Sequence, residues 1–301
     1  MNFFLYINNQ KDKGFAVAEE VASYLKANGA HFCLEDTMRE LVSDTIYLSK
    51  AQFMPLDECI KSSSNAIVIG GDGTILKASK LLYGCDIPII GINMGKVGYM
   101  SELEKNEIEF LSALLSDADC RDKMSVDERM MLSCKVLRND SEVFSSVCLN
   151  EAVVAKGDIT RMIHLKLKLD GVTIAEYQCD GLIAATPTGS TAYAMSAGGA
   201  IIDPKIECIS VVPLSPYLCI NSSPIIFSKE SVLEITYISE RGNSAYVSFD
   251  GDESFKLSDG DRVIISNAQH NTKLLRFKKT DFYKLLNTKL ADRFSELADK
   301  N

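Results

Sequence analysis

The sequence predicts an α/β domain with a parallel sheet and helices on its faces, followed by a β-rich domain. Up to about residue 121, short apolar runs alternate with helical patterns, which is the order of a parallel sheet covered by helices. After about Ser125, alternation of apolar and polar residues and turn-forming pairs dominate. We therefore expect an α/β domain over 1–124, a β-rich domain over 125–270, and a tail over 271–301 that packs back on the first domain.

The first domain begins with a strand-like run and a helix with one apolar stripe. Val17, Val21 and Leu25 form the stripe, and Asn28-Gly29 provides a C-cap that ends this helix. Further helices are expected over Ile75–Leu82 and Glu104–Leu115. The apolar runs that predict strands are Phe3–Ile7, Ala66–Ile69 and Ile87–Ile90.

The second domain contains a strong hairpin pattern. Residues 164–174 alternate apolar and polar side chains around Asp170-Gly171, which predicts two strands joined by a tight turn. Lys166 and Lys168 then lie on a solvated strand face. Further strands are expected at Ile209–Val212, Val232–Tyr237, Ala245–Phe249 and Arg262–Ser266.

The tail combines a short apolar run, Leu274–Phe277, with an amphipathic helix over Asp281–Leu297. We expect both to return to the α/β domain, because the helix needs a partner for its apolar positions and the β domain has facing sheets to fill its own core. These positions are Phe282, Leu285, Leu286, Leu290, Phe294 and Leu297.

Composition excludes several function classes. The net charge of −9 argues against a nucleic-acid binder, and no apolar run reaches membrane-spanning length. The nine cysteines contain no C-x-x-C pair, which is typical of a reducing cytosol, so we expect a cytoplasmic protein. His31, His164 and His270 show no metal-ligand spacing, and a protein-built zinc site is not expected.

The turn Gly70-Gly71-Asp72-Gly73-Thr74 places a carboxylate inside a glycine-rich cradle between a strand and a helix. Such glycines let the backbone approach a polyphosphate, and the helix N-terminus offers free N–H groups. Because a carboxylate there repels phosphate, we interpret Asp72 as the acceptor of a hydroxyl proton during phosphoryl transfer. The alternative is a tight Asp-Gly turn that caps a helix. Neither a Walker A loop nor a G-x-G-x-x-G fingerprint occurs.

Three other segments are candidates for ligand binding. The glycine-rich loop Gly91–Tyr99 follows a strand at the sheet edge where α/β folds bind ligands, although a structural loop explains it equally well. Asn150-Glu151 sits between apolar runs and suits ribose hydroxyls and a base edge, with a turn between strands as the alternative. The stretch Asp180–Gly199 is rich in small and hydroxyl side chains around Tyr193, which can stack on a flat ligand.

Taken in order, these motifs resemble those of the NAD kinase family. The glycine turn alone is shared with lipid kinases and 6-phosphofructokinases, but the combination with Asn150-Glu151, Asp180-Gly181 and Thr186–Gly199 is specific. The resemblance implies an enzyme that transfers a phosphoryl group from ATP, or from polyphosphate, to the 2′-hydroxyl of the adenosine ribose of NAD. It also implies a divalent metal (Mg or Mn) whose ligands stay open, and a homo-oligomer, dimer or tetramer.

The resemblance also implies roles for single residues. Asp72 would be the proton acceptor, Gly73 would line the nucleotide site, and Asn150 and Glu151 would hold ribose and base. Lys77 and Arg161 fall where the family contacts nucleotide, and Asp180 would reach the dinucleotide from a neighbouring subunit. The implied dinucleotide loop consists of Thr188, Thr191, Ala192, Tyr193, Ala194, Met195 and Ser196.

Some positions depart from the family pattern. Gln178 stands two residues before Asp180, where some members carry a cation, so the preference between NAD and NADH stays open. Ala200 replaces a common Pro, Tyr217 a frequent His and Ser223 a frequent Arg, which weakens the inferred subunit contacts and phosphate recruitment. Two other functions remain. A lipid kinase needs an apolar groove that Thr186–Ser196 does not offer, and a non-catalytic dinucleotide sensor has no need of Asp72.

Overall fold

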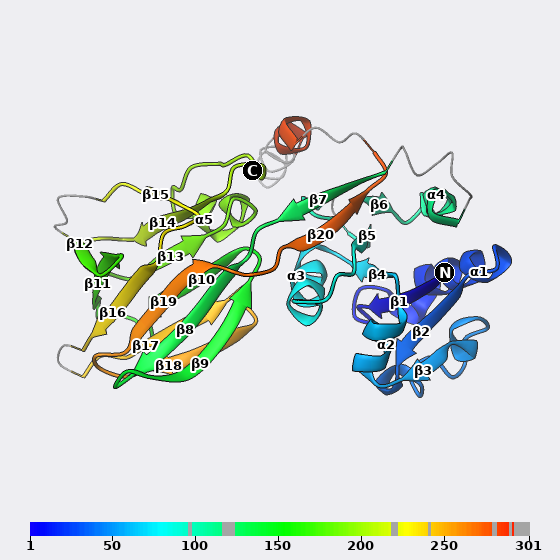
Figure 1. Ribbon diagram of the computed structural model, residues 1–301, viewed down its shortest axis with the longest axis horizontal. Helices are drawn as coiled ribbons and strands as arrows, with labels where there is room; N and C mark the ends of the chain where they lie inside the picture. Colours follow the sequence, from blue (N-terminus) through cyan, green and yellow to red (C-terminus); the bar gives the residue numbers. More distant parts are fainter. Residues whose placement is uncertain are drawn as a thin grey trace, which may run out of the picture. The chain divides into compact units, whose positions relative to one another are not determined.

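The computed structural model describes residues 1–95, 98–115, 124–217, 222–239, 242–278, 282–288 and 291. The chain forms two compact units, which Figure 1 shows coloured along the sequence. The first unit consists of Met1–Glu128 together with Lys273–Asn301, and the second of Arg129–Thr272. The chain therefore passes between the units twice, and the first unit is discontinuous in sequence.

The first unit is built on an eight-stranded sheet in the order β3-β2-β1-β4-β5-β20-β7, with β6 also paired to β5. The pairs of β1 with β2 and β4, of β2 with β3, and of β5 with β4, β6 and β20 are parallel. The strands are β1 (Asn2–Ile7), β2 (His31–Glu35), β3 (Gln52–Met54), β4 (Asn65–Gly70), β5 (Ile89–Asn93), β6 (Leu103–Glu104), β7 (Ser125–Arg129) and β20 (Thr272–Arg276).

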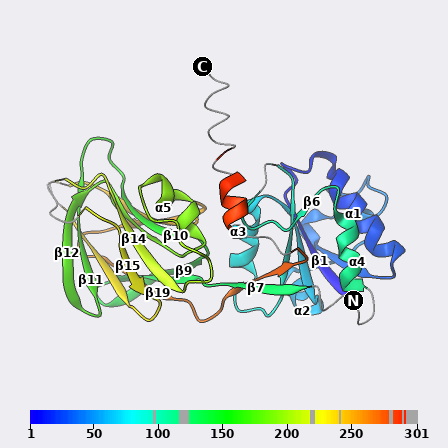
Figure 2. The ribbon, with the colours of Figure 1, turned by 90° about the horizontal axis from the view of Figure 1, so that it is seen from above.

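The helices described in this unit are α1 (Ala16–Ala27), α2 (Leu56–Ser62), α3 (Asp72–Leu81), α4 (Ser112–Leu115) and the helical residues 282–288. Short 3-10 turns cover Lys13–Phe15, Asp36–Met38, Leu48–Lys50 and Ile108–Leu111. α1 buries the predicted stripe, and Gly29 ends it with a φ of 72°. α1 and α4 lie side by side over one shared apolar core (Figure 2).

The helix expected over Glu104–Leu115 is wrong in its first half. Leu103 and Glu104 form β6, which pairs in parallel with Ile92 and Asn93 of β5, and helical structure starts only at Ile108. The Glu107 carboxylate also accepts the N–H of Glu104 at 2.9 Å, which closes a turn at this point. Sheet pairing therefore overrides the helical propensity of this segment.

The second unit contains two antiparallel six-stranded sheets, with orders β15-β14-β13-β10-β17-β18 and β12-β11-β16-β19-β8-β9. The helical turn η6 (Gly189–Thr191) and α5 (Tyr193–Ser196) follow β13, and α5 lies against the first of these sheets (Figures 1 and 2). The strands are β8 (Leu132–Arg138), β9 (Ser141–Cys148), β10 (Glu151–Lys156), β11 (Ile163–Leu169), β12 (Val172–Cys179), β13 (Gly181–Ala185), β14 (Cys208–Leu214), β15 (Ile225–Ser228), β16 (Leu233–Ile238), β17 (Ala245–Phe249), β18 (Glu253–Leu257) and β19 (Arg262–Asn267).

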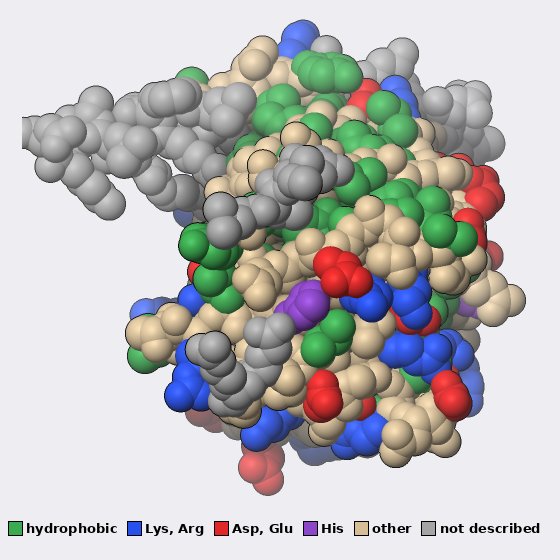
Figure 3. Space-filling model, turned by 90° about the vertical axis from the view of Figure 1, so that its left-hand side faces the viewer, with side chains coloured by type: hydrophobic (Ala, Val, Ile, Leu, Met, Phe, Trp, Pro, Cys, Tyr) green, Lys and Arg blue, Asp and Glu red, His purple; other side chains and the backbone are tan. Residues whose placement is uncertain are grey.

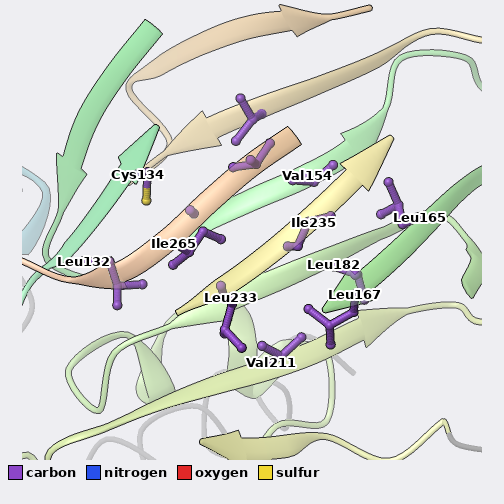
Figure 4. Close-up of a cluster of buried hydrophobic side chains, with 14 of the residues drawn as sticks. Leu132, Cys134, Val154, Leu165, Leu167, Leu182, Val211, Leu233, Ile235 and Ile265 are labelled. Carbon is purple, nitrogen blue, oxygen red and sulfur yellow. The ribbon is translucent and has the colours of Figure 1, made fainter. Parts of the chain in front are cut away.

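The core of the second unit lies between its two sheets. Figure 4 shows Leu165, Leu167 and Ile235 from one sheet beside Val154, Leu182 and Val211 from the other, all fully buried or nearly so. These side chains occupy alternate positions, as expected for strands with one buried face.

The predicted hairpin is confirmed. β11 and β12 pair around Asp170 and Gly171, which have φ values of 48° and 84°. Lys166 pairs with Glu176 at 3.0 Å and Lys168 with Glu234 at 2.8 Å, as expected for a solvated strand face. Figure 3 looks onto the side that carries β11 and β12, and it shows basic and acidic side chains interspersed over the lower part.

The return of the chain to the first unit is also confirmed. β20 enters the first sheet between β5 and β7, and its residues Leu274 and Leu275 are buried. Of the predicted tail helix, residues 282–288 are helical and Leu286 is buried. Leu290, Phe294 and Leu297 lie outside the described residues. No helix within the described ranges is long and apolar enough to cross a membrane.

Candidate functional site

The glycine turn joins β4 to α3 and is closed by Thr74. Gly71 is the N-cap of α3, and Asp72 is the first residue of the helix. The Thr74 hydroxyl accepts the side-chain N–H of Asn8 at 3.0 Å, and a Cβ on Gly70 would stand 2.3 Å from this hydroxyl. The turn can therefore close so tightly only with glycine at position 70.

The Asp72 carboxylate is held by the second glycine-rich loop. Its Oδ2 accepts the N–H of Tyr99 at 2.8 Å, and its Oδ1 accepts the N–H of Met100 at 3.2 Å. A Cβ on Gly98 would stand 2.0 Å from Oδ1, so only glycine lets the loop backbone approach the carboxylate this closely. The structure thus joins two motifs that the sequence analysis treated separately. Lys96 and Val97 of this loop lie outside the described residues.

Positive charge gathers at the same turn. Lys11 follows β1, and its ammonium group lies over Gly71, because a Cβ on that glycine would be 2.6 Å from Nζ. The N-terminus of α3 adds a partial positive charge there, and Lys77 is exposed on the next turn of α3. Gly73 is exposed, with open space where a side chain would be. An anion at this turn would compensate both the helix terminus and Lys11.

Lys11 was missed in the sequence analysis, although a pattern was available. It follows the apolar run that ends at Ile7, and β1 and β4 are parallel neighbours in register Ile7 with Ile69. Residues just after the two strands must therefore meet at the same edge of the sheet.

In the second unit, the Asp250 carboxylate holds the backbone of Asn150 and Glu151. Its Oδ1 accepts the backbone N–H of Asn150 at 2.8 Å and of Glu151 at 3.0 Å, and its Oδ2 accepts that of Leu149 at 2.7 Å. Asp250 itself adopts a φ of 50°, and its N–H donates to the Glu151 carbonyl. This carboxylate was not predicted as a site residue.

Asn150 and Glu151 are buried with unsatisfied oxygens. Asn150 Oδ1 and Glu151 Oε2 have no hydrogen-bond partner among the residues that the structure describes. Burial, and then the neighbouring Asp250 carboxylate, raise the pKa of Glu151 to about 7, while the N–H of Tyr193 lowers it. Because buried polar atoms are nearly always paired, these two oxygens are available to accept hydrogen bonds from a ligand or from water.

The loop Thr186–Ser196 uses several of its hydroxyls to hold its own shape. The Thr186 hydroxyl donates to the Leu149 carbonyl at 2.6 Å, and the Ser190 hydroxyl to the Pro187 carbonyl at 2.6 Å. Thr191 donates to the Thr188 carbonyl at 3.3 Å. The hydroxyl protons of Thr186, Ser190 and Thr191 are therefore donated to backbone carbonyls of the same region, while their oxygens can still accept hydrogen bonds.

The loop residues differ in what they offer to a ligand. Thr188 is buried and accepts a hydrogen bond from Arg129 at 3.3 Å, and Ala194 is buried against the β13 sheet. Tyr193 is 47% exposed, and its backbone N–H reaches Glu151. The remaining predicted positions are exposed Ser196 and half-buried Ala192 and Met195.

Arg161, Gln178 and Asp180 lie near the end of β10 that is opposite to Glu151. Asp180 pairs with Lys156 at 2.7 Å, and Lys156 ends the strand β10 that Glu151 begins. Five residues of strand separate the two ends by about 17 Å. Arg161 and Gln178 lie near Asp180, since Ile163 pairs with Cys179, and the Gln178 carbonyl accepts the N–H of Tyr217 at 2.8 Å. One chain therefore does not bring Arg161, Gln178 and Asp180 to Glu151.

Comparison with known proteins agrees with these features. A model of the ATP-NAD kinase N-terminal domain matches residues 3–119, and a model of the C-terminal domain matches residues 149–277. The NAD kinase of Natranaerobius thermophilus is 40% identical over 227 residues, which are 74% of this chain and 76% of that protein. The NAD kinase of Carboxydothermus hydrogenoformans is 34% identical over 286 residues, 95% of this chain and 98% of that protein.

Solved structures share the fold. An NAD kinase from Archaeoglobus fulgidus in complex with ATP has a TM-score of 0.73 at 27% identity, covering 97% of this chain and 99% of that one. Yeast NADH kinase complexed with NADH has a TM-score of 0.86 at 20% identity, covering 97% and 87%. Since the two family models span both units and relatives above 30% identity cover nearly the whole chain, this chain belongs to the NAD kinase family of phosphotransferases.

Proposed function

We propose that the chain transfers the γ-phosphoryl group of ATP to the 2′-hydroxyl of the adenosine ribose of NAD, with Asp72 as proton acceptor. The observation that carries the proposal is the carboxylate of Asp72, fixed by two backbone amides at a glycine-rich helix N-terminus. An anchored carboxylate beside a phosphate-binding turn is what proton abstraction from an attacking hydroxyl needs.

In the transfer, a bond forms between the ribose 2′-oxygen and the γ-phosphorus, and the bond from that phosphorus to the β–γ bridging oxygen breaks. ADP leaves with the bridging oxygen, and the hydroxyl proton goes to Asp72. Lys11, Lys77 and the N–H groups of α3 attract the phosphate charges. Such preorganised positive groups account for much of the rate in phosphoryl transfer.

The second unit binds the dinucleotide in this proposal. The unpartnered oxygens of Asn150 and Glu151 accept hydrogen bonds from ribose hydroxyls and the base edge, and the exposed ring of Tyr193 stacks on NAD. Arg161, Gln178 and Asp180 act on a dinucleotide held mainly by a neighbouring subunit, which their separation from Glu151 along β10 supports. The active protein is then a homo-oligomer.

These residues fit a divalent metal that would be bound mainly by the phosphates of the nucleotide. Within the described ranges, no three His, Cys, Asp or Glu side chains are grouped to hold a metal ion. Mg²⁺ usually takes one or two carboxylates with phosphates and water, so ATP itself would supply most ligands, and the Asp72 carboxylate at the glycine-rich turn would be available as another. When bound, the metal would neutralise charge on the phosphates.

The deciding experiment incubates the purified chain with NAD, ATP and magnesium and measures NADP. Asp72→Asn should lower turnover by roughly 10²–10⁴, the usual loss for a general base, while NAD affinity changes little. NAD affinity is measured separately, because Asn offers the two loop amides only one acceptor oxygen. A parallel arm with polyphosphate in place of ATP identifies the donor.

Other outcomes identify the other functions. Turnover of diacylglycerol but not of NAD would show a lipid kinase and refute the proposal. Tight NAD binding without any NADP would show a dinucleotide sensor. If Asp72→Asn binds NAD far more weakly than the wild type, the carboxylate is a ligand contact and not the base.

A further inference from the structure

The returning strand β20 places one arginine against the loop that holds Asp72. Arg276 Nη1 donates to the Met100 carbonyl at 3.0 Å and lies 3.5 Å from the Ser101 carbonyl. Met100 is thus held on both sides, since its N–H donates to Asp72 and its carbonyl accepts from Arg276. The described part of this loop, residues 98–102, has no strand or helix of its own to fix its amides.

Two carboxylates hold Arg276 in place. Its Nε and Nη2 donate to Asp127 of β7 at 3.1 and 3.0 Å, and its Nη1 lies 3.3 Å from Glu102. The Glu102 side chain is 2% exposed, and its other oxygen accepts the N–H groups of Phe277 and Lys278, both at 2.8 Å. The Arg276 side chain is 13% exposed, so it is largely shielded from water.

We propose that Arg276 is a positioning residue for phosphoryl transfer, which holds the Met100–Ser101 carbonyls and thereby the two amides that orient the Asp72 carboxylate. This inference rests on the proposed role of Asp72. It gives a reason for the return of the chain to the first unit. Through Arg276, β20 supplies a charged donor to these carbonyls.

Arginine suits this task because its planar fork carries five donors in fixed directions. Here the fork serves two carboxylates and the loop carbonyls together. A lysine would keep the positive charge beside Glu102 and Asp127, but its single ammonium group cannot reach the same set of acceptors. Arg276→Lys therefore removes the geometry and leaves the buried carboxylates compensated, which limits the loss of stability.

The test measures kcat and both KM values for Arg276→Lys, alone and combined with Asp72→Asn. We expect kcat to fall about 10- to 100-fold, the cost of a misplaced catalytic group, with the KM for NAD unchanged. In the Asp72→Asn protein, Arg276→Lys should have no further effect on kcat. The matched control is Lys273→Gln, which removes a cation from the same strand, paired with Asp86 away from the loop, and should leave kcat unchanged.

The outcomes separate this inference from the proposed function. Full kcat in Arg276→Lys, or an equal loss with and without Asp72, overturns the inference alone. Full kcat in Asp72→Asn overturns the proposed function and the inference with it. A second measurement needs no variant: the amides of Tyr99 and Met100 should exchange with deuterium as slowly as those of β5, and fast exchange contradicts a fixed loop.

Discussion

Replacing Glu151 by Gln should remove a pH-dependent loss of stability from the second unit. Burial and the Asp250 carboxylate raise the pKa of Glu151 from 4.5 to about 7 in the folded chain. The folded state therefore disfavours the charged carboxyl relative to the unfolded state. The stability that the fold gains from the protonated Glu151 carboxyl is fully present below the unfolded pKa. It is lost as the pH rises through the folded pKa.

The size of the effect follows from the two pKa values. The pKa of Glu151 rises from 4.5 in the unfolded chain to about 7 in the folded chain. Each pKa unit corresponds to about 1.4 kcal/mol of free energy. The wild type should thus lose up to about 3 kcal/mol of unfolding free energy through this group by slightly alkaline pH. Gln has nearly the same shape and no charge, so the advantage of Glu151→Gln should grow from near zero in acid to that value.

The assay is urea unfolding of both proteins, followed by circular dichroism at about pH 5, 6, 7 and 8 and constant salt. The matched control is Glu176→Gln. Glu176 is 47% exposed, and its pKa is lowered, chiefly by the hydrogen bond from Lys166, so it stays ionised over this range. Wild-type and Glu151→Gln curves that run parallel from acid to alkaline pH would refute the reasoning, since Glu151 would then ionise like an exposed carboxyl.

Two further substitutions test the first unit. Gly98→Ala should lower kcat about 100-fold, because the new Cβ would stand 2.0 Å from Asp72 Oδ1. NAD affinity, measured by calorimetry, should not change. The control is Gly95→Ala in the same loop, whose Cβ meets no atom within 4 Å and which should have a mild effect. Lys11→Ala should raise the KM for ATP about tenfold or more, the cost of a charge-assisted contact, and leave the KM for NAD unchanged. An equal effect of Lys13→Ala would show only a general loss of positive charge.

The sequence predicted most of the fold because its patterns are local. Alternation around Asp170-Gly171 predicts a hairpin, and Leu274–Phe277 is apolar enough to require a partner, which β5 provides. The helix expected from Glu104 failed for the opposite reason. Leu103 is recruited to the sheet by β5, and a periodicity within one segment contains no information about a strand elsewhere in the chain.

The candidate site shows the same limit. Asp72 and Glu151 could be found because each sits in a short motif with its own chemistry. Asp250 and Arg276 could not, since they act on backbone amides and carbonyls that are distant along the chain. Gly98 was noticed as part of a glycine-rich loop. Glycine is required there because the loop backbone approaches the carboxylate of Asp72, which lies 26 residues earlier in the chain (72 to 98). Spacing alone does not reveal such pairs.

The two carboxylates owe their different tasks to their surroundings. Asp72 is half-buried, and both of its oxygens face backbone N–H donors of one loop. Glu151 is buried beside a second carboxylate, and one of its oxygens has no partner in the described residues. A carboxyl that holds a proton near neutral pH can donate to a ligand as well as accept, which suits recognition of ribose and base. In the proposed reaction the 2′-hydroxyl proton goes to Asp72, because this carboxylate lies at the glycine-rich turn where the phosphates would bind.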